Sequence, residues 1–188
     1  MLLLMRHGPT RANDDHRIRS VVNFPLSDEG HRLASDLAEQ VQGFPLASLT
    51  SSPLDRAVDS MKPVSDATGV PFSTHDGLLP WDMGQLAGQD VSRVQPFIRD
   101  LLQHPDVKAP GGQSFNEFAH ALMSTVWPAI QDDKLHGVMA HGSVAQTIEA
   151  AVRNRSKNLA SAVSEDRPSI DPGGMALVTP EKFIPLHR

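Results

Sequence analysis

The sequence of 188 residues contains no cysteine, and this absence restricts the chemistry open to the protein. Disulfide bonds, thiol nucleophiles and cysteine-ligated metal sites are all excluded. Long apolar runs are also missing. The apolar segment at residues 1–5 is too short for a signal sequence and has no basic residue before it, and no segment approaches the length of a membrane span. We therefore expect a cytoplasmic protein with no membrane partner.

Patterns typical of common ligand sites are absent as well. The sequence has no HExxH or similar spacing of metal ligands, no GxxxxGK loop and no GxGxxG pattern, so we expect neither a metal nor a cofactor. The formal net charge of −5 argues against nucleic acid as the main partner, because binding to backbone phosphates needs a basic face. The oligomeric state stays open at this level.

Short apolar segments alternate with amphipathic segments along the chain, and this pattern predicts the fold class. The apolar segments, which we expect to form strands, cover residues 1–5, 46–50, 70–74, 137–140 and 173–179. The length suffices for one domain with a substantial core and is too short for two. We therefore predict an α/β fold: a single three-layer α/β/α domain over residues 1–188, with a mostly parallel central sheet.

Capping residues predict where two of the helices begin. Ser27 is a natural N-cap, with acidic residues directly after it. Ser114 and Glu117, three residues apart, form a capping box. The tail after Thr179 carries no comparable signal, and we expect it to be loosely held.

Prolines predict further helix boundaries. Pro53 suits the first position of a helix, and Pro63 should kink or shorten that same helix. Pro96 should mark a break in a helix over residues 91–103, or its true start. The helix that follows Ser114 should end near Pro128.

Cationic and imidazole side chains follow three of the predicted strands at the point where each strand ends. Arg6 and His7 follow the first strand, Arg56 lies just after the second, and His141 follows the fourth. Parallel strands would bring all four to one edge of the sheet, which is where open α/β sheets bind ligands. Arginine suits phosphate recognition, and a histidine can act as a nucleophile or a base.

These segments, taken together and in this order, resemble the histidine phosphatase superfamily, also called phosphoglycerate mutase-like. The matching residues are those at 6–13, those at 51–57, and the His-Gly pair at 141–142 before a predicted helix. The resemblance implies a phosphoglycerate mutase-like fold and a covalent mechanism without a metal. His7 would attack a phosphoryl group as a neutral imidazole and form a phosphohistidine, which water then hydrolyses. Arg6, Arg56 and His141 would hold the phosphoryl oxygens and stabilise the charge of the transferring group.

The expected phosphate-binding set is larger than these residues. Glycine at position 8 lets the backbone approach a ligand closely. Ser143 opens a helix, and helix N-termini favour anions. The complete expected set is Arg6, Gly8, Asn13, Arg56, His141, Gly142 and Ser143.

The sequence departs from the family at the residue that donates a proton to the leaving oxygen. Many members carry a glutamate in a pattern L-x-E-x-x-x-G, whereas this chain has Pro80 in that place, between Leu78 and Gly84. Proline cannot transfer a proton. Asp82, two residues later, could serve as the catalytic acid if the loop brings it inward. Without an acid, alkyl phosphates should react poorly, whereas acyl phosphates, anhydrides and phosphohistidines should be much less affected.

Three functions remain open from the sequence. The first is a phosphatase that hydrolyses phosphomonoesters, phosphohistidine or activated phosphates, with a small phosphorylated substrate or a phosphoprotein as partner. The second is a phosphoglycerate mutase-type phosphotransferase, and the third is a non-catalytic phosphate-binding module that has lost its acid. Arg11, Arg17 and Arg19 could bind a second anionic group, but a solvated basic loop is the favoured interpretation. We expect solvent exposure for the other seven histidines, among them His16, His31 and His136.

Overall fold

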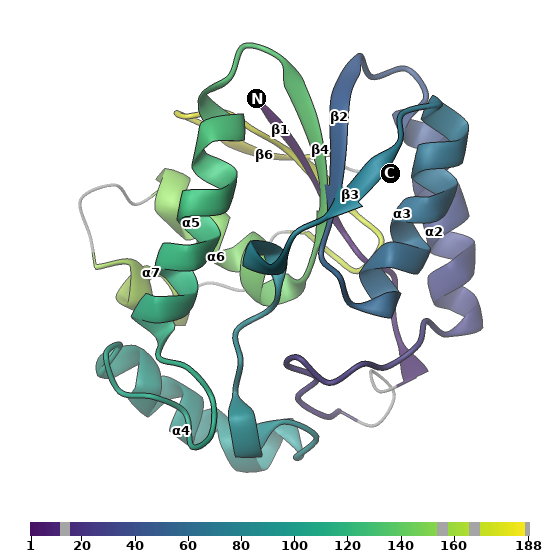
Figure 1. Ribbon diagram of the computed structural model, residues 1–188. Coiled ribbons are helices and arrows are strands. Elements are labelled where there is room, and N and C mark those ends of the chain that lie inside the picture. The colour runs from purple at the N-terminus through teal and green to yellow at the C-terminus, as the bar shows by residue number, and fades with distance from the viewer. Residues whose placement is uncertain (12–15, 154–157, 166–169, 187–188) are drawn as a thin grey trace.

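A computed structural model describes residues 1–11, 16–153, 158–165 and 170–186. Its centre is a six-stranded sheet in the order β3-β2-β4-β1-β5-β6 (Figure 1). The strands are β1 (Leu2–Arg6), β2 (Leu46–Ser51), β3 (Phe72–Thr74), β4 (Leu135–Ala140), β5 (Met175–Val178) and β6 (Phe183–Leu186). The first four pair in parallel, whereas β5 and β6 pair antiparallel with their neighbours. The prediction of a mostly parallel α/β sheet is confirmed.

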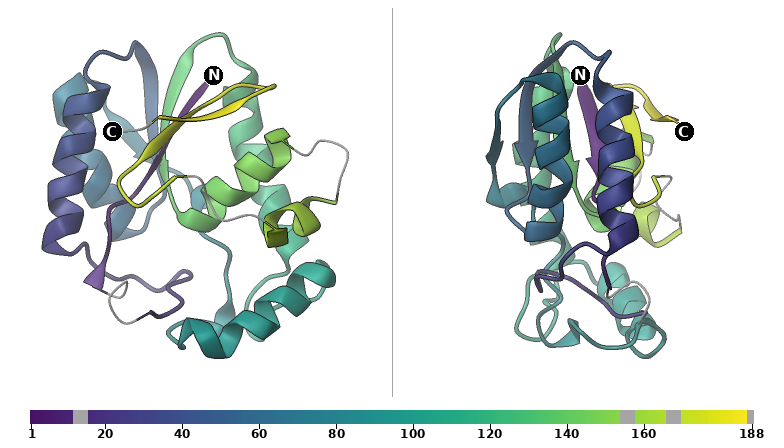
Figure 2. Two further views of the ribbon diagram at one scale, coloured as in Figure 1. Left: turned by 180° about the vertical axis from the view of Figure 1, so that it is seen from behind. Right: turned by 90° about the vertical axis from the view of Figure 1, so that its right-hand side faces the viewer.

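Helices cover both faces of the sheet, so that the molecule has three layers (Figure 2). The helices α2 (Asp28–Val41) and α3 (Asp55–Thr68) pack against one face. The helices α5 (Phe115–Gln131), α6 (Gly142–Arg153) and α7 (Leu159–Glu165) belong to the other side. The remaining helix, α4 (Val91–Gln103), lies at the bottom of Figure 1, beyond the carboxyl ends of the central strands.

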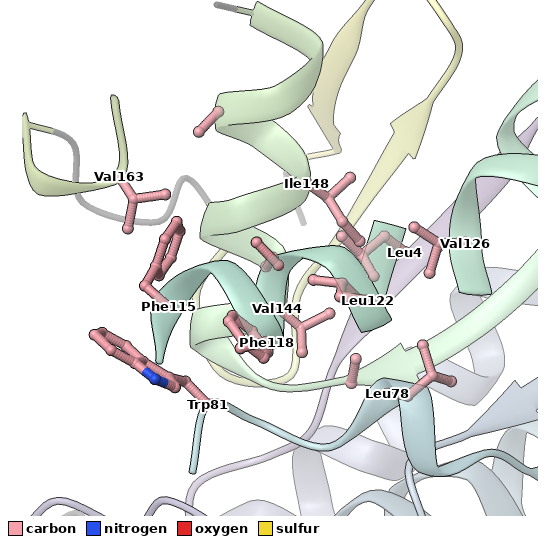
Figure 3. Packing of buried hydrophobic residues seen from close by; sticks show 14 of the residues in the cluster. Leu4, Leu78, Trp81, Phe115, Phe118, Leu122, Val126, Val144, Ile148 and Val163 are labelled. Carbon is pink, nitrogen blue, oxygen red and sulfur yellow. The ribbon is translucent and has the colours of Figure 1, made fainter. Parts of the chain in front are cut away.

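Strand β1 joins the two halves of the core. Leu2 and Leu4 pack into the cluster that contains α5 and α6, and Leu3 and Met5 pack into the cluster that contains α2 and α3. All four side chains are fully buried. A strand covered on both faces needs an unbroken apolar run rather than an alternating one, which explains the apolar start of the sequence. Figure 3 shows Leu4 among the side chains of its cluster.

The predicted helix caps are present. Ser27 Oγ accepts a hydrogen bond from the Gly30 N–H at 3.1 Å and begins α2. Ser114 Oγ accepts from the Glu117 N–H at 3.1 Å, and Glu117 Oε2 accepts from the Ser114 N–H at 3.0 Å. This reciprocal pair is the capping box, and it fixes the start of α5 beside the site described below.

The boundaries predicted from proline were wrong. Helix α3 begins at Asp55, after Pro53, and continues past Pro63 to Thr68. Helix α4 begins at Val91 with Pro96 inside it, and α5 runs past Pro128 to Gln131. A proline in a helix removes one N–H donor, but burial of the apolar face on both sides of it offsets that loss.

The C-terminal tail was also wrongly predicted to be loose. Residues Phe183–Leu186 form β6, an edge strand that pairs with β5. Phe183 is buried, and the guanidinium of Arg153 lies 5.8 Å from the centroid of its ring.

Among the helices of the described ranges, none combines the length and the apolar character that a membrane-spanning helix needs.

Candidate active site

The carboxyl ends of β1, β2 and β4 meet at a cavity of about 730 Å³. Its wall includes His7, which directly follows β1, Arg56 from the first turn of α3, and His141, which follows β4. The parallel order of these strands therefore brings together residues that lie up to 134 positions apart, as the sequence predicted.

His7 has the geometry of a nucleophile. Its side chain is buried, and Nδ1 lies 2.6 Å from the carbonyl oxygen of Gly8. Because a carbonyl oxygen can only accept, Nδ1 carries the hydrogen and Nε2 keeps its lone pair. Burial, together with the positive charge of Arg56, holds the pKa of His7 well below its usual value. The imidazole is therefore neutral, as nucleophilic attack requires.

Arg56 fixes the loop over the site and keeps its Nε–H unpaired. Its side chain is buried, Nη1 donates to the carbonyl of Val22 at 2.8 Å, and Nη2 donates to the carbonyl of Ser20 at 2.8 Å. Its Nε is buried and has no hydrogen-bond partner. Burial, followed by the charge of Arg19, lowers the pKa of Arg56 to about 10, so the group stays cationic at neutral pH.

Arg6 lies behind the cavity wall, against the turn between β4 and α6. Its Nη1 donates to the carbonyl of Ile170 at 2.8 Å, and its Nε is buried without a partner. Burial, then the charge of Arg19, lowers the pKa of Arg6 to about 10. A Cβ atom on Gly142 would lie only 3.1 Å from Arg6 Nη2. Glycine at position 142 therefore makes room for the guanidinium.

His141 stands beside His7, with 5.0 Å between the two ring centroids. Its Nε2 lies 2.7 Å from Ser52 Oγ, and its Nδ1 is buried with no partner. When the Ser52 hydroxyl donates to Nε2, the hydrogen of the ring is on Nδ1, where it can be donated to an anion. Burial, then the neighbouring His7, holds the pKa of His141 well below its usual value.

Arg19 is a residue of the cavity wall for which the sequence favoured a solvated loop. It is half-buried and lines the cavity rather than forming part of a solvated loop. Its positive charge contributes to the lowered pKa values of both histidines and of Arg6 and Arg56. The signal in the sequence was the neighbouring Ile18, which packs against the core and holds the basic segment to the molecule.

Three members of the expected phosphate-binding set remain: Gly8, Ser143 and Asn13. Packing alone accounts for a glycine at position 8, because a Cβ there would lie 2.5 Å from the carbonyl oxygen of Gly30. Ser143 lines the cavity, and its Oγ accepts from the Trp81 N–H at 3.4 Å. Asn13 lies outside the described residues.

The loop after β3 does not bring Asp82 inward. Pro80 lines the cavity, whereas Asp82 is not part of its wall. The Asp82 carboxylate accepts from the Gly84 N–H at 2.9 Å, and its backbone carbonyl accepts from the Gln113 N–H at 3.1 Å. Both bonds direct this residue into the turn that contains Gly84. The hypothesis that Asp82 is the catalytic acid has no geometric support in this arrangement.

The remaining histidines lie mostly where the sequence suggested. Five of the six that the structure describes are exposed, although His16 also lines the cavity. His136 is the exception: it is half-buried, with Nδ1 2.8 Å from Ser48 Oγ and Nε2 2.9 Å from Asp132 Oδ2.

In the described part of the chain, no three histidine or acidic side chains form a group that could hold a metal ion.

Comparisons with solved structures identify the fold. The structure of mycobacterial glucosyl-3-phosphoglycerate phosphatase superimposes with a TM-score of 0.77 at 19% identity, covering 93% of this chain and 87% of that one. The phosphoglycerate mutase of Thermus thermophilus gives a TM-score of 0.78 at 22% identity, covering 100% and 98%. At such identities the likeness establishes the shared phosphoglycerate mutase-like fold.

Sequence comparisons extend the likeness to the family. The probable phosphoglycerate mutase GpmB of Salmonella choleraesuis (strain SC-B67) is 26% identical over 157 residues, covering 77% of this chain and 73% of that protein. The model of the histidine phosphatase superfamily (branch 1) matches residues 2–166, a span that includes the strand-end residues around His7, Arg56 and His141. The chain belongs to the histidine phosphatase superfamily, whose members are phosphatases or mutases.

Proposed function

We propose that this protein is a metal-independent phosphatase that hydrolyses phosphomonoesters through a phosphohistidine on His7. One observation carries the proposal. In the described part of the chain, the buried side-chain nitrogens without a hydrogen-bond partner are Arg6 Nε, Arg56 Nε and His141 Nδ1, and all three belong to residues gathered around this site. An unpaired buried donor costs about 1–3 kcal/mol. A phosphoryl group in the cavity has the oxygens and the charge to satisfy the donors of Arg56 and His141, which line it, and Arg6 adds a positive charge behind the wall.

The first step follows from the state of His7. Its Nε2 lone pair attacks phosphorus, so that a P–N bond forms while the P–O bond to the alcohol breaks with its electron pair. The Nδ1–H bond to the Gly8 carbonyl holds the ring and stabilises the positive charge that the imidazole acquires. Arg6 and Arg56 stabilise the charge on the transferring group, which is the main catalytic contribution in phosphoryl chemistry. Water then attacks phosphorus and the P–N bond breaks, so that its electron pair returns to Nε2 of His7, while the released phosphate and the solvent take up the proton of the water.

The leaving oxygen receives less help than in relatives with the family glutamate. Pro80 occupies that place at the cavity wall and has no proton to donate. General acid catalysis contributes typically about a hundred- to ten-thousand-fold. We therefore expect the rate to fall steeply as the pKa of the leaving alcohol rises. Aryl, acyl and similarly activated phosphates should be the better substrates.

Two other functions have some support. A mutase-type phosphotransferase is favoured by the name of the Salmonella relative, which shares 26% of its aligned residues with this chain. A phosphate-binding module without turnover is favoured by Pro80. His7 has a neutral ring and a fixed tautomer, and both properties favour the phosphatase over the binding module.

Hydrolysis of 4-nitrophenyl phosphate in EDTA tests the proposal. The wild type should turn over, and His7→Ala should lose at least about a thousandfold in kcat, because no other nucleophile replaces the ring. His31→Ala, an exposed residue on α2, is the matched control and should keep full activity. Bound phosphate without turnover would support the module. Conversion of 3-phosphoglycerate to 2-phosphoglycerate faster than hydrolysis would support the mutase.

A further inference from the structure

The cavity extends well beyond the phosphate end, and much of its additional wall is apolar. Three aromatic residues from the loop after β3 and the start of α5 form one part of this wall. Aliphatic residues from α4 and α7 form another part. We name these residues the apolar chamber: Trp81, Ile98, Leu102, Phe115, Phe118 and Val163.

The aromatic part of the apolar chamber is held in place by its own contacts. The rings of Trp81 and Phe115 meet edge to face with centroids 5.4 Å apart, and Trp81 stacks against Phe118 at 6.5 Å. Trp81 Nε1 donates to the carbonyl of Gln113 at 3.1 Å, so the polar edge of its ring is satisfied within the protein. Figure 3 shows Trp81, Phe115 and Val163 following one another along one side of the cluster. The wall is therefore preformed.

Hydrogen bonds join this wall directly to the phosphate end. Arg56 Nη2 donates to the carbonyl of Ser20, and Ser20 Oγ donates to the carbonyl of Trp81 at 3.1 Å. The Trp81 N–H in turn donates to Ser143 Oγ, which lies two residues after His141. The apolar chamber therefore begins next to the residues that would hold the phosphate, so that a group attached to this phosphate would face it.

We propose that the substrate is a phosphomonoester whose alcohol part is apolar and at least of aromatic size, with the apolar chamber as its binding surface. This inference rests on the phosphatase function proposed above and specifies its substrate class. A fully hydroxylated alcohol part would leave the aromatic and aliphatic walls facing polar groups and would gain little from them. The cavity wall also includes the exposed residues Arg17 and Arg99, so a substrate with a second negative charge is the alternative to exclude.

A pair of aryl phosphates with nearly equal leaving groups isolates the effect of apolar size. We expect kcat/KM for 4-propylphenyl phosphate to exceed that for phenyl phosphate about tenfold, as burial of roughly two methylene groups would give. Ile98→Asp places a charge in the chamber and should remove most of this preference. Phe97→Asp is the matched control: Phe97 is the adjacent residue on α4, is 60% exposed and is not part of the cavity wall, so the preference should remain.

Binding measurements separate a failure of this inference from a failure of the phosphatase function. Calorimetry with 4-propylbenzylphosphonate and benzylphosphonate needs no turnover, and the propyl compound should bind about tenfold more tightly to the wild type but not to Ile98→Asp. Equal affinities, or a kcat/KM for 3-phosphoglycerate above that for 4-propylphenyl phosphate, would overturn the substrate class while hydrolysis through His7 stands. Absence of turnover with the binding preference intact would overturn the phosphatase and leave the apolar chamber as a ligand site.

Discussion

Mild acid should destabilise the ligand-free protein, because the folded state resists protonation of His7 and His141. Both pKa values are held well below that of a free histidine, in each case chiefly by burial. An unfolded chain binds these protons near pH 6.5, whereas the folded chain does not. The contribution to stability is therefore fully present above about pH 6.5 and is lost as the pH falls toward the folded-state pKa values.

The loss of stability per pH unit follows from the number of protons that only the unfolded chain binds. Each histidine that stays neutral in the folded state costs about 1.4 kcal/mol for every pH unit below 6.5. At pH 5.5 the two groups together should lower the free energy of unfolding by roughly 3 kcal/mol. This is a large part of the 5–15 kcal/mol that is typical of a folded domain. Most carboxylates titrate at lower pH, so the window between pH 7 and 5.5 reports mainly on the histidines.

Urea unfolding at several pH values between 7.5 and 5.5 measures this slope. The double variant His7→Gln, His141→Gln lacks both groups, so its free energy of unfolding should fall by roughly 3 kcal/mol less than that of the wild type between pH 7.5 and 5.5, or about half that amount per pH unit. Vanadate should reduce the wild-type slope as well, because an anion between the rings favours their charged forms. Equal slopes in the wild type and the double variant would refute the view that the two buried rings resist protonation.

Three further predictions concern single residues. Ser52→Ala should lower kcat about fivefold, since a bond of about 1 kcal/mol that fixes the His141 tautomer is lost; an unchanged kcat and pH profile would contradict this. Gly8→Ala should lower the free energy of unfolding by about 3 kcal/mol and Tm by about 6–12 °C, because its Cβ would meet the backbone of α2 at 2.5 Å. Gly43→Ala, whose Cβ would meet nothing within 4 Å, is the control, and calorimetric melts that coincide would contradict the packing argument. Arg19→Gln should weaken vanadate binding about tenfold, because a charge beside the site is lost. Titration calorimetry measures this affinity, and equal affinities would contradict a role of Arg19 in the site.

The sequence predicted the positions of the site residues that follow the ends of strands. Apolar strands followed by Arg6, Arg56 or His141 placed these side chains at one edge of a parallel sheet. In the structure Arg6 lies at the carboxyl end of β1, and Arg56 and His141 line the cavity at that edge. The predicted strand over residues 137–140 falls within β4, and that over 46–50 falls within β2. These predictions needed only local patterns and a topological rule.

Features that depend on tertiary packing could not be predicted from local sequence patterns. Arg19 looked like a loop residue because its neighbours in the cavity come from distant segments. Pro63 and Pro128 did not end their helices, because buried residues on both sides hold those helices against the sheet. The edge strand β6 was missed because its stability comes from pairing with β5 and from the burial of Phe183 rather than from a strong local pattern.

Trapping of the phosphoenzyme tests the central claim most directly. The wild type, mixed with 4-nitrophenyl phosphate and quenched within milliseconds into alkaline denaturant, should carry a phosphoryl group that is stable to alkali and labile to acid. Mass spectrometry should place this group on the peptide that contains His7, and His7→Ala should carry none. A wild type that releases phosphate at a measurable rate, with no phosphoryl group on His7 under single-turnover conditions, would contradict the covalent mechanism.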